Sequence, residues 1–392
     1  MRDAQRVAVD SMMEPPEGPA APVRQLEIRF TGSGRGYFRI WIVNLLLVLA
    51  SLSLYYPWAK ARRLRYFHGH TLVDGTPLGF HGNPRTMFRG YLLVGVLFAL
   101  YSLAGRVSML AGLSALALVA AIAPALFRSS MRFRLASTSW RGMRFAFGGS
   151  TGDAYRAILP LFVTVLFLAG AVAWVRPVDQ PPSWFAPLIA AVALVTLALS
   201  PWLLFRLKRF QHTNYGLASL QTGFKATVGG FYALVFKTFA WAALYVLAVI
   251  AAALGLMLLS RGGNPDGLLQ SALLSVLPIP LLLAAYLIAK TYFTAALQNL
   301  VWTKTGNRSM RLVSRLRFSQ LFWLTVRNWL LIVLTLGLYW PFAAVASTRL
   351  RLESVSIKTR QDPAVLVSLL QASDVEAAGD AAGDLLGLDI GL

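Results

Sequence analysis

The chain has 392 residues, a formal net charge of +21 and no cysteine. Apolar residues make up 57% of it and charged residues only 14%, whereas soluble globular proteins carry about 25% charged residues. This balance excludes an ordinary soluble domain, and the lack of cysteine excludes disulfides, thiolate zinc sites and cysteine catalysis. Several apolar stretches reach the roughly 17–25 residues that a membrane-spanning helix needs. The composition therefore predicts a polytopic, all-α membrane protein.

Both ends of the chain differ from the apolar part between them. Residues 1–22 combine proline, glutamate and glycine without the apolar core of a cleavable signal. Residues 361–392 contain six acidic residues, no lysine or arginine, and a low-complexity ending, which is typical of disordered segments. The sequence thus predicts a membrane domain over residues 23–360 between two disordered tails.

The membrane domain begins with a short strand, "LEIRF" at 26–30, and an apolar segment from Phe38 to Pro57. That segment ends in Tyr-Pro-Trp and continues as the basic helix "AKARRLRYF". Aromatic residues and cations at the end of a membrane segment are typical of the headgroup region. We therefore expect an anchor at the cytoplasmic surface here.

The same arrangement recurs with constant spacing, because a proline is followed eight residues later by an arginine at four places. The pairs are Pro57 and Arg65, Pro124 and Arg132, Pro201 and Arg209, and Pro341 and Arg349. A fixed spacing of this kind indicates an internal repeat. We predict parallel units of two helices each, near residues 26–70, 71–137, 138–214, 215–299 and 300–357.

Short β-hairpins are expected between the helix pairs. Asp74-Gly75 is a strong turn signal in "HTLVDGTPLGFHG", and Arg141-Gly142 divides two β-rich runs in "STSWRGMRFAFGG". The stretch 299–318 suggests a longer hairpin around Gly306-Asn307. The terminal strands "LEIRF" and "LESVSIK", at 26–30 and 352–358, could pair and close these hairpins into a ring under the membrane.

Six membrane spans are expected between the hairpins, near residues 89–105, 107–127, 157–175, 184–205, 232–259 and 268–290. The short connections within each pair carry one cation each, whereas the hairpin-bearing loops hold most of the remaining lysines and arginines. By the positive-inside rule, the basic loops are predicted to be cytoplasmic.

The first and last apolar segments, Phe38 to Pro57 and Phe322 to Pro341, cover only 19 residues each. A straight helix of this length measures about 28 Å and would just span. Alternatively, each segment breaks at 50–57 or 335–341 and returns to the same side, with arms of about 14 Å. Basic residues on both flanks favour this re-entrant interpretation, which requires protein or water to cover the broken backbone.

Two asparagines occupy matching positions, each thirteen residues before the proline of a terminal segment. They are candidates for a polar path or for capping of a broken helix. The alternative is ordinary hydrogen bonding between helices, worth about 0.6 kcal/mol on average in one membrane protein, and the sequence leaves both open. The candidate residues at the two segments are Asn44, Tyr55, Pro57, Asn328, Tyr339 and Pro341.

A second set of candidate residues consists of cations on the basic helices, which are predicted to contact anionic lipid headgroups. Basic residues among aromatics can also indicate RNA binding, but at the foot of a membrane helix they indicate an interfacial anchor, so no nucleic acid is expected. A homo-oligomer or a soluble cytoplasmic partner stays open. The candidate headgroup contacts are Arg62, Arg63, Arg65, Arg132, Arg209 and Arg349.

No motif predicts catalysis, a cofactor or a metal. In "FTGSGRGYF", Tyr37 stands where the dinucleotide fingerprint needs its third glycine. His68, His70 and His81 lack both carboxylate support and the ligand spacing of a zinc site on a helix. We therefore expect a protein that is not an enzyme.

Three stretches carry a family resemblance: "FTGSGRGYFRIWIVNLLLVLASLSLYYPWAKARRLRYFHGHT", "RLASTSWRGMRFAFGGS" and "LTLGLYWPFAAVASTRLR". They resemble the YjgN-like family of bacterial inner-membrane proteins over roughly residues 26–357. The resemblance implies a multi-span fold in the inner membrane of a Gram-negative-type bacterium. The function of that family is unknown, so the resemblance implies no substrate and no site residue.

Two classes of function remain. A transporter or channel-like protein for a small or amphipathic solute is suggested by parallel repeats and broken segments. The alternative is a membrane-organising scaffold that binds lipid headgroups or a soluble partner with its arginine-rich cytoplasmic face. We favour transport, with a solute path near the broken terminal segments.

Overall fold

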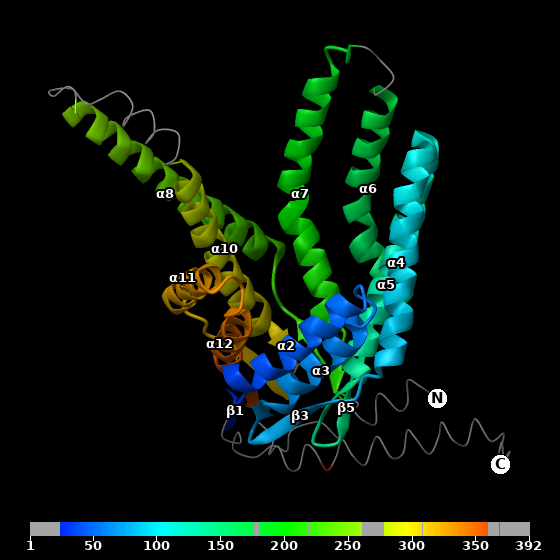
Figure 1. Cartoon of the computed structure of the whole chain (residues 1–392), viewed down its shortest axis with the longest axis vertical. Coiled ribbons are helices and arrows are strands. Elements are labelled where there is room, and N and C mark those ends of the chain that lie inside the picture. The colour runs from blue at the N-terminus through cyan, green and yellow to red at the C-terminus, as the bar shows by residue number, and fades with distance from the viewer. Residues whose placement is uncertain are drawn as a thin grey trace, which may run out of the picture.

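The computed structural model describes residues 24–175, 180–217, 220–260, 278–307 and 309–359, together with residue 368. Figure 1 shows long helices rising from one side of a sheet. The helices are α2 (Gly34–Ala50), α3 (Tyr56–Gly69), α4 (Pro84–Val107), α5 (Met109–Ala136), α6 (Thr151–Val175), α7 (Phe185–Thr213), α8 (Val228–Ser260), α10 (Pro278–Thr303), α11 (Phe318–Leu334) and α12 (Trp340–Glu353).

The strands form a single sheet, in which every neighbouring pair for which the register is known is antiparallel. They are β1 (Arg24–Phe30), β2 (Thr71–Val73), β3 (Thr76–Phe80), β4 (Thr138–Trp140), β5 (Met143–Phe147), β6 (Tyr215–Leu217), β7 (Leu220–Gln221), β8 (Gly223–Phe224), β9 (Thr305–Gly306), β10 (Met310–Ser314) and β11 (Val355–Thr359).

The chain itself joins the two ends of the sheet. Its 11 strands run in the order β7-β6-β5-β4-β3-β2-β1-β11-β10-β9-β8, and the two ends of this order, β7 and β8, are separated along the chain by Thr222 alone. The predicted pairing of the terminal strands is confirmed, since β1 pairs with β11 from Arg24 and Thr359 onward. We call this sheet, whose strands surround one cavity, the β-ring. The predicted all-α class is therefore incomplete, because the hairpins join edge to edge into one sheet.

Turn chemistry explains two of the hairpins. Asp74 and Gly75 have φ values of 50° and 73°, and Arg141 and Gly142 have values of 49° and 84°. Positive φ at both central residues defines the type I′ turn that matches the twist of paired strands. The turns predicted at these two dipeptides are confirmed, and an ion pair of 2.7 Å between Arg141 and Asp74 joins them.

The third predicted hairpin is shorter than expected. Residues 299–303 belong to helix α10, and only Thr305–Gly306 forms the first strand before β10. Leu300 and Val301 pack against the buried rings of Phe205 and Phe231. This packing on α7 and α8 stabilises the segment as a helix, although its sequence also fits a strand.

The order of elements follows one scheme around the β-ring: a strand, two helices, and a strand that pairs with the first. The helix pairs are α2–α3, α4–α5, α6–α7, α8–α10 and α11–α12. Neighbouring pairs pack on one another, and α12 packs on α2. The first and last helix pairs thus lie side by side, as Figure 1 shows in blue and orange.

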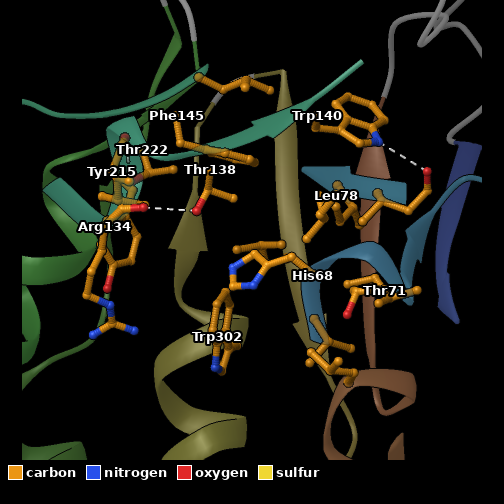
Figure 2. Close-up of a pocket in the computed structure, with 18 of the residues that line it drawn as sticks. His68, Thr71, Leu78, Arg134, Thr138, Trp140, Phe145, Tyr215, Thr222 and Trp302 are labelled. Atoms are coloured by element: carbon orange, nitrogen blue, oxygen red, sulfur yellow. Dashed lines mark hydrogen bonds between the residues drawn. The ribbon is translucent and has the colours of Figure 1, made fainter. Parts of the chain in front are cut away.

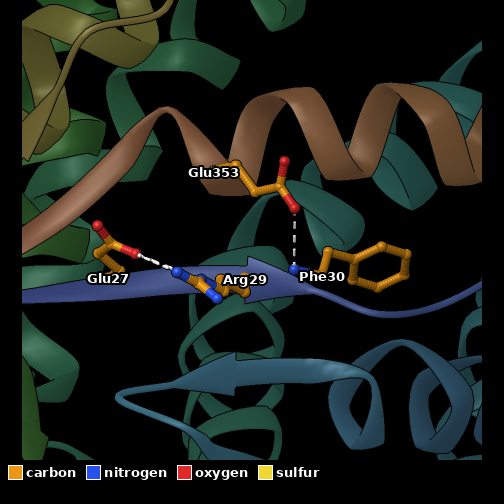
Figure 3. A network of polar contacts seen from close by, with 4 residues as sticks. All are labelled: Glu27, Arg29, Phe30 and Glu353. Carbon is orange, nitrogen blue, oxygen red and sulfur yellow. Dashed lines mark hydrogen bonds and ion pairs between the residues drawn. The ribbon is translucent and has the colours of Figure 1, made fainter.

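Aromatic stacking holds this seam between the two ends of the described chain. Trp41 stacks on Trp340 at 6.2 Å between ring centroids, and Phe38 lies 5.8 Å from Phe342. At the base of the seam, the backbone N–H of Phe30 donates a hydrogen bond of 3.2 Å to the carboxylate of Glu353, which Figure 3 shows.

Within the described residues, six helices are long and apolar enough to cross a membrane: α4, α5, α6, α7, α8 and α10. Each overlaps one of the six predicted spans. The last prediction ended too early, because α10 continues from residue 290 to Thr303, and residues 268–277 lie outside the described part. Pro124 and Pro201 lie inside continuous helices, so α5 and α7 run on past the proline as basic helices to Ala136 and Thr213.

The first and last segments are helical hairpins that leave the β-ring and return to it. The strands that flank α2 and α3 pair at Phe30 and Thr71, and those that flank α11 and α12 pair at Ser314 and Val355. The breaks fall at 51–55 and 335–339, inside the predicted stretches. The arms are longer than predicted, at 17 and 14 residues in both hairpins, because each helix includes part of the polar flank.

The same hydrogen-bond pattern closes both breaks. Leu52 and Leu336 adopt positive φ, and the next residue, Ser53 or Gly337, donates its N–H to the carbonyl five residues earlier at 2.8 Å. This is the Schellman arrangement, which normally places glycine at the positive-φ position. Here leucine occupies it, with 88% and 95% of its surface exposed.

Candidate functional site

A cavity of about 810 Å³ lies inside the β-ring, between its strands and the lower ends of the helices. The second helix of each pair contributes to its wall: α3, α5, α7, α10 and α12. The inward-facing residues of the strands complete it, for example Leu26 and Ile28 of β1, whose neighbours Gln25, Glu27 and Arg29 are exposed outside. This alternation is expected of a sheet with one apolar face.

The strand side of the wall is apolar. Val73, Trp140, Met143, Leu217 and Leu220 form a buried cluster, and four of these five line the cavity. In Figure 2, Trp140 and Leu78 stand at one side of the cavity and Phe145 at the other. The indole of Trp140 donates a hydrogen bond of 3.2 Å to the Val73 carbonyl, so its polar atom is satisfied without a ligand.

The helix side of the wall carries three cations: Arg134 on α5, Lys208 on α7 and Arg351 on α12. No aspartate or glutamate is among the described residues of the wall. The ammonium of Lys208 donates a hydrogen bond of 3.1 Å to Gln211, and Nε of Arg351 donates one of 2.8 Å to Gln298. Burial lowers the pKa of Arg351, but a guanidinium stays charged in proteins.

The remaining titratable groups of the wall are neutral near pH 7. Burial lowers the pKa of His68, the hydrogen bond to the Leu64 carbonyl opposes this, and the charge of Arg134 adds to the lowering. Burial raises the pKa of Tyr215 to about 12 against the opposing effect of Arg134. The cavity therefore combines an apolar surface with an uncompensated positive charge.

The predicted polar residues of the terminal segments lie within the hairpins and not in the cavity wall. Asn44 donates to the carbonyl of Ala59 at 3.4 Å and accepts from Arg62 at 3.5 Å. Asn328 donates to the hydroxyl of Ser347 at 3.3 Å, while its buried carbonyl oxygen has no partner among the described residues. Both asparagines thus join the two arms of a hairpin.

The other predicted residues of these segments cluster at the start of the second arm. Pro57 and Pro341 are fully buried and occupy the first turn of α3 and α12, where proline needs no backbone donor. The rings of Tyr55 and Tyr339 stack on Trp58 and Phe342, respectively.

The predicted headgroup arginines lie on exposed helix faces outside the cavity wall. Arg65 and Arg349 each donate to the backbone carbonyl of a glycine at the start of a neighbouring unit, Gly82 at 3.5 Å and Gly32 at 2.8 Å. Arg62 and Arg63 lie over the rings of Tyr55 and Trp340. Arg132 and Arg209 are exposed, and Arg209 lies over the ring of Phe205.

Sequence reasoning missed the cavity cations. Arg134 and Arg351 each lie two residues beyond the arginine that marked the repeat. The signal that could have found them is the second spacing, since a cation follows the proline by ten residues in both units. Among the residues that the structure describes, no group of three His, Cys, Asp or Glu could hold a metal ion.

These features define a class: a polytopic membrane protein in which helix pairs stand on a β-ring around an amphipathic cavity. Comparison places the chain in a family. The family model described as "Bacterial protein of unknown function (DUF898)" matches residues 25–385, and the chain belongs to this family. The resemblance to the YjgN-like family is confirmed by the curated relatives.

The relatives carry the same name. The chain is similar to inner membrane protein YjgN of Salmonella typhimurium strain LT2, with 24% identity over 336 residues, 81% of this chain and 84% of that protein. YjgN of Escherichia coli K12 is 24% identical over 169 residues, 43% of this chain and 42% of that protein. YjgN of E. coli O157:H7 is 31% identical over 126 residues, 31% of each chain. No solved structure matches the chain.

Proposed function

We propose that this chain is a transport protein of the bacterial inner membrane, and that its solute occupies the cavity of the β-ring. The observation that carries the proposal is the cavity itself, which is large enough for a ligand and has wall residues from all five helix pairs. A solute there would contact every helix pair at once. Its binding or release would therefore act on all five pairs.

The arrangement of units supports this proposal. We interpret the five strand–helix–helix–strand units as parallel repeats around the cavity, and solute sites between repeats are common in transporters. We also propose that the hairpins α2–α3 and α11–α12 are re-entrant, because both ends of each return to the β-ring. Their exposed tips, Leu52 and Leu336, would then lie in lipid.

The orientation follows from charge. The basic residues of the chain concentrate at the β-ring and on the lower helix ends, whereas the connection between α4 and α5 carries only Arg106. The positive-inside rule then puts the β-ring and its cavity on the cytoplasmic side. The apolar helices above the cavity would separate it from the periplasm.

Access to the cavity from both sides of the membrane tests the proposal. The chain has no cysteine, so Thr348→Cys provides a single thiol in the cavity wall. Arg144→Cys, on the exposed face of β5, controls for the cytoplasmic side. Val107→Cys, 82% exposed at the end of α4, controls for the periplasmic side.

Each variant is treated with a membrane-impermeant maleimide in intact cells and in inverted vesicles. Transport predicts that Thr348→Cys reacts from both sides, whereas each control reacts from one side only. Reaction of Thr348→Cys from the cytoplasmic side alone would overturn transport and leave a binding protein.

The alternative function is a membrane-organising scaffold with no transport. The exposed face of α3 favours it, since Arg62, Arg63 and Arg65 lie there next to interfacial aromatic residues. Such cations attract anionic headgroups by roughly 1 kcal/mol each. Replacing all three by glutamate should abolish the preference of the purified protein for anionic over neutral lipid if this face is its function. Neither function assigns a catalytic role to the chain.

A further inference from the structure

The charges in the cavity wall determine the sign of the ligand. Arg134, Lys208 and Arg351 line one cavity, and no carboxylate of the described wall compensates them. The guanidinium of Arg134 makes no hydrogen bond within the described chain, and Arg351 uses only its Nε atom, for Gln298. The donors that remain suit a carboxylate or a phosphate, which arginine binds through two parallel hydrogen bonds.

The rest of the wall determines the other end of the ligand. Trp140, Phe145, Leu78 and Ile357 present apolar surface from four different strands. A small polar anion would leave this surface in contact with water, whereas an alkyl chain would cover it. The volume of about 810 Å³ lies in the range that holds one drug-sized ligand, roughly 300–1,000 Å³, and this favours a single-chain amphiphile over a two-chain lipid.

We infer that the cavity of the β-ring binds a single-chain amphiphile with an anionic head, a carboxylate or a phosphate. The head lies on the helix side, at Arg134, Lys208 and Arg351, and the tail lies along the apolar strands. This inference rests on the proposed function, which places a solute in this cavity, and it names the chemical class of that solute.

Binding to the purified full-length chain in nanodiscs of neutral lipid tests the inference. The probes are hexadecanoate, hexadecyl phosphate and hexadecan-1-ol, which share a tail and differ in the head. The binding of empty nanodiscs is subtracted from each measurement. We expect saturable binding of the two anions and at least tenfold weaker binding of the alcohol, because the alcohol cannot form charge-assisted hydrogen bonds. The anion that binds with the higher affinity shows whether the natural ligand carries a carboxylate or a phosphate head.

Paired variants locate the head. Arg134→Gln with Lys208→Gln removes two charges from the cavity wall, and we expect at least tenfold weaker binding of hexadecanoate. Arg144→Gln with Arg311→Gln removes two charges from exposed strand positions outside the cavity and should change binding less than twofold. If the first pair fails to fold, Arg134→Lys, which keeps the charge but not the planar fork, should weaken binding by a smaller factor.

Equal binding of hexadecanoate and hexadecan-1-ol by the unmodified protein would overturn the inference without any variant. Equal losses in the two paired variants would overturn the assignment of the head. The maleimide experiment is independent of the binding experiment. If the protein binds the anions but Thr348→Cys reacts from the cytoplasmic side only, transport is refuted and the amphiphile inference stands. If Thr348→Cys reacts from both sides but the protein does not bind the anions, the amphiphile inference is refuted and transport stands.

Discussion

The hairpins α2–α3 and α11–α12 should end within the bilayer. Helix α2 has 17 residues and is therefore about 25 Å long, whereas the 24 residues of α4 give about 36 Å. The hydrocarbon core is about 30 Å thick, and in Figure 1 α2 lies obliquely to the upright helices α4 to α7. Its tip at Leu52 should thus remain inside the core, while α4 crosses it.

Spin labels on single cysteines measure this depth. Labels at Leu52→Cys and Leu336→Cys should collide readily with oxygen and poorly with a water-soluble nickel chelate, as expected in hydrocarbon. A label at the exposed Val107→Cys position should collide with the chelate, because it lies at the far end of α4. An impermeant maleimide that modifies Leu52→Cys in intact cells would refute the reasoning, since the segment would then span.

The backbone at the tips provides an independent energetic test. A leucine at positive φ costs about 1–2 kcal/mol that glycine avoids, whereas a leucine side chain transferred from water to an apolar phase gains about 1.5–3 kcal/mol. Leu52→Gly with Leu336→Gly should raise the unfolding temperature if the tips lie in water. In lipid, the lost side-chain contacts offset the gain, so no increase is expected.

Three further predictions concern stability, each measured as the unfolding temperature of the purified protein. Gly306→Ala should cost about 1–3 kcal/mol, because its Cβ would lie 2.6 Å from a backbone oxygen of β10, whereas Gly95→Ala meets open space inside helix α4 and should not destabilise the protein. Asn44→Leu should cost about 1 kcal/mol more than Asn328→Leu, because the carbonyl of Asn328 already lacks a partner. Equal effects within either pair would contradict these assignments. Because burial lowers the pKa of His68 in the folded state, the unfolded chain binds its proton first, so stability should fall as pH drops below about 6.5. His68→Gln should remove that part of the pH dependence, and an unchanged pH profile would show that His68 does not cause it.

Local signals predicted the parts of the fold that depend on local physics. Asp74-Gly75 and Arg141-Gly142 specify type I′ turns by their tolerance of positive φ. The six spans follow from long apolar runs, which a bilayer requires to be helical. The breaks in the terminal segments coincide with "ASLSLYYP" and "TLGLYWP", where a proline occupies the first turn of the second arm.

The cavity could not be predicted in the same way. Arg132 and Arg134 are two residues apart on α5, about 200° around the helix, so one faces outward when the other faces the cavity. The repeat spacing identified Arg132, and only the rotation of α5 against its neighbours decides which of the two lines the cavity. Likewise, Pro124 predicts a helix end locally, but packing of the helix pairs keeps α5 continuous.

The position of the short hairpins connects the fold to the proposed ligand. Three neighbouring helix pairs, α4–α5, α6–α7 and α8–α10, are long enough to cross a bilayer, whereas the hairpins α2–α3 and α11–α12 adjoin each other where α12 packs on α2. If the tips of these hairpins end within the bilayer, the helices on this side of the protein do not reach its far surface. Lipid would fill the space above the two hairpins, over the part of the cavity wall that α3 and α12 form. An amphiphile held by its head in the β-ring could then exchange its tail with the bilayer there, which a wall of five spanning pairs would prevent.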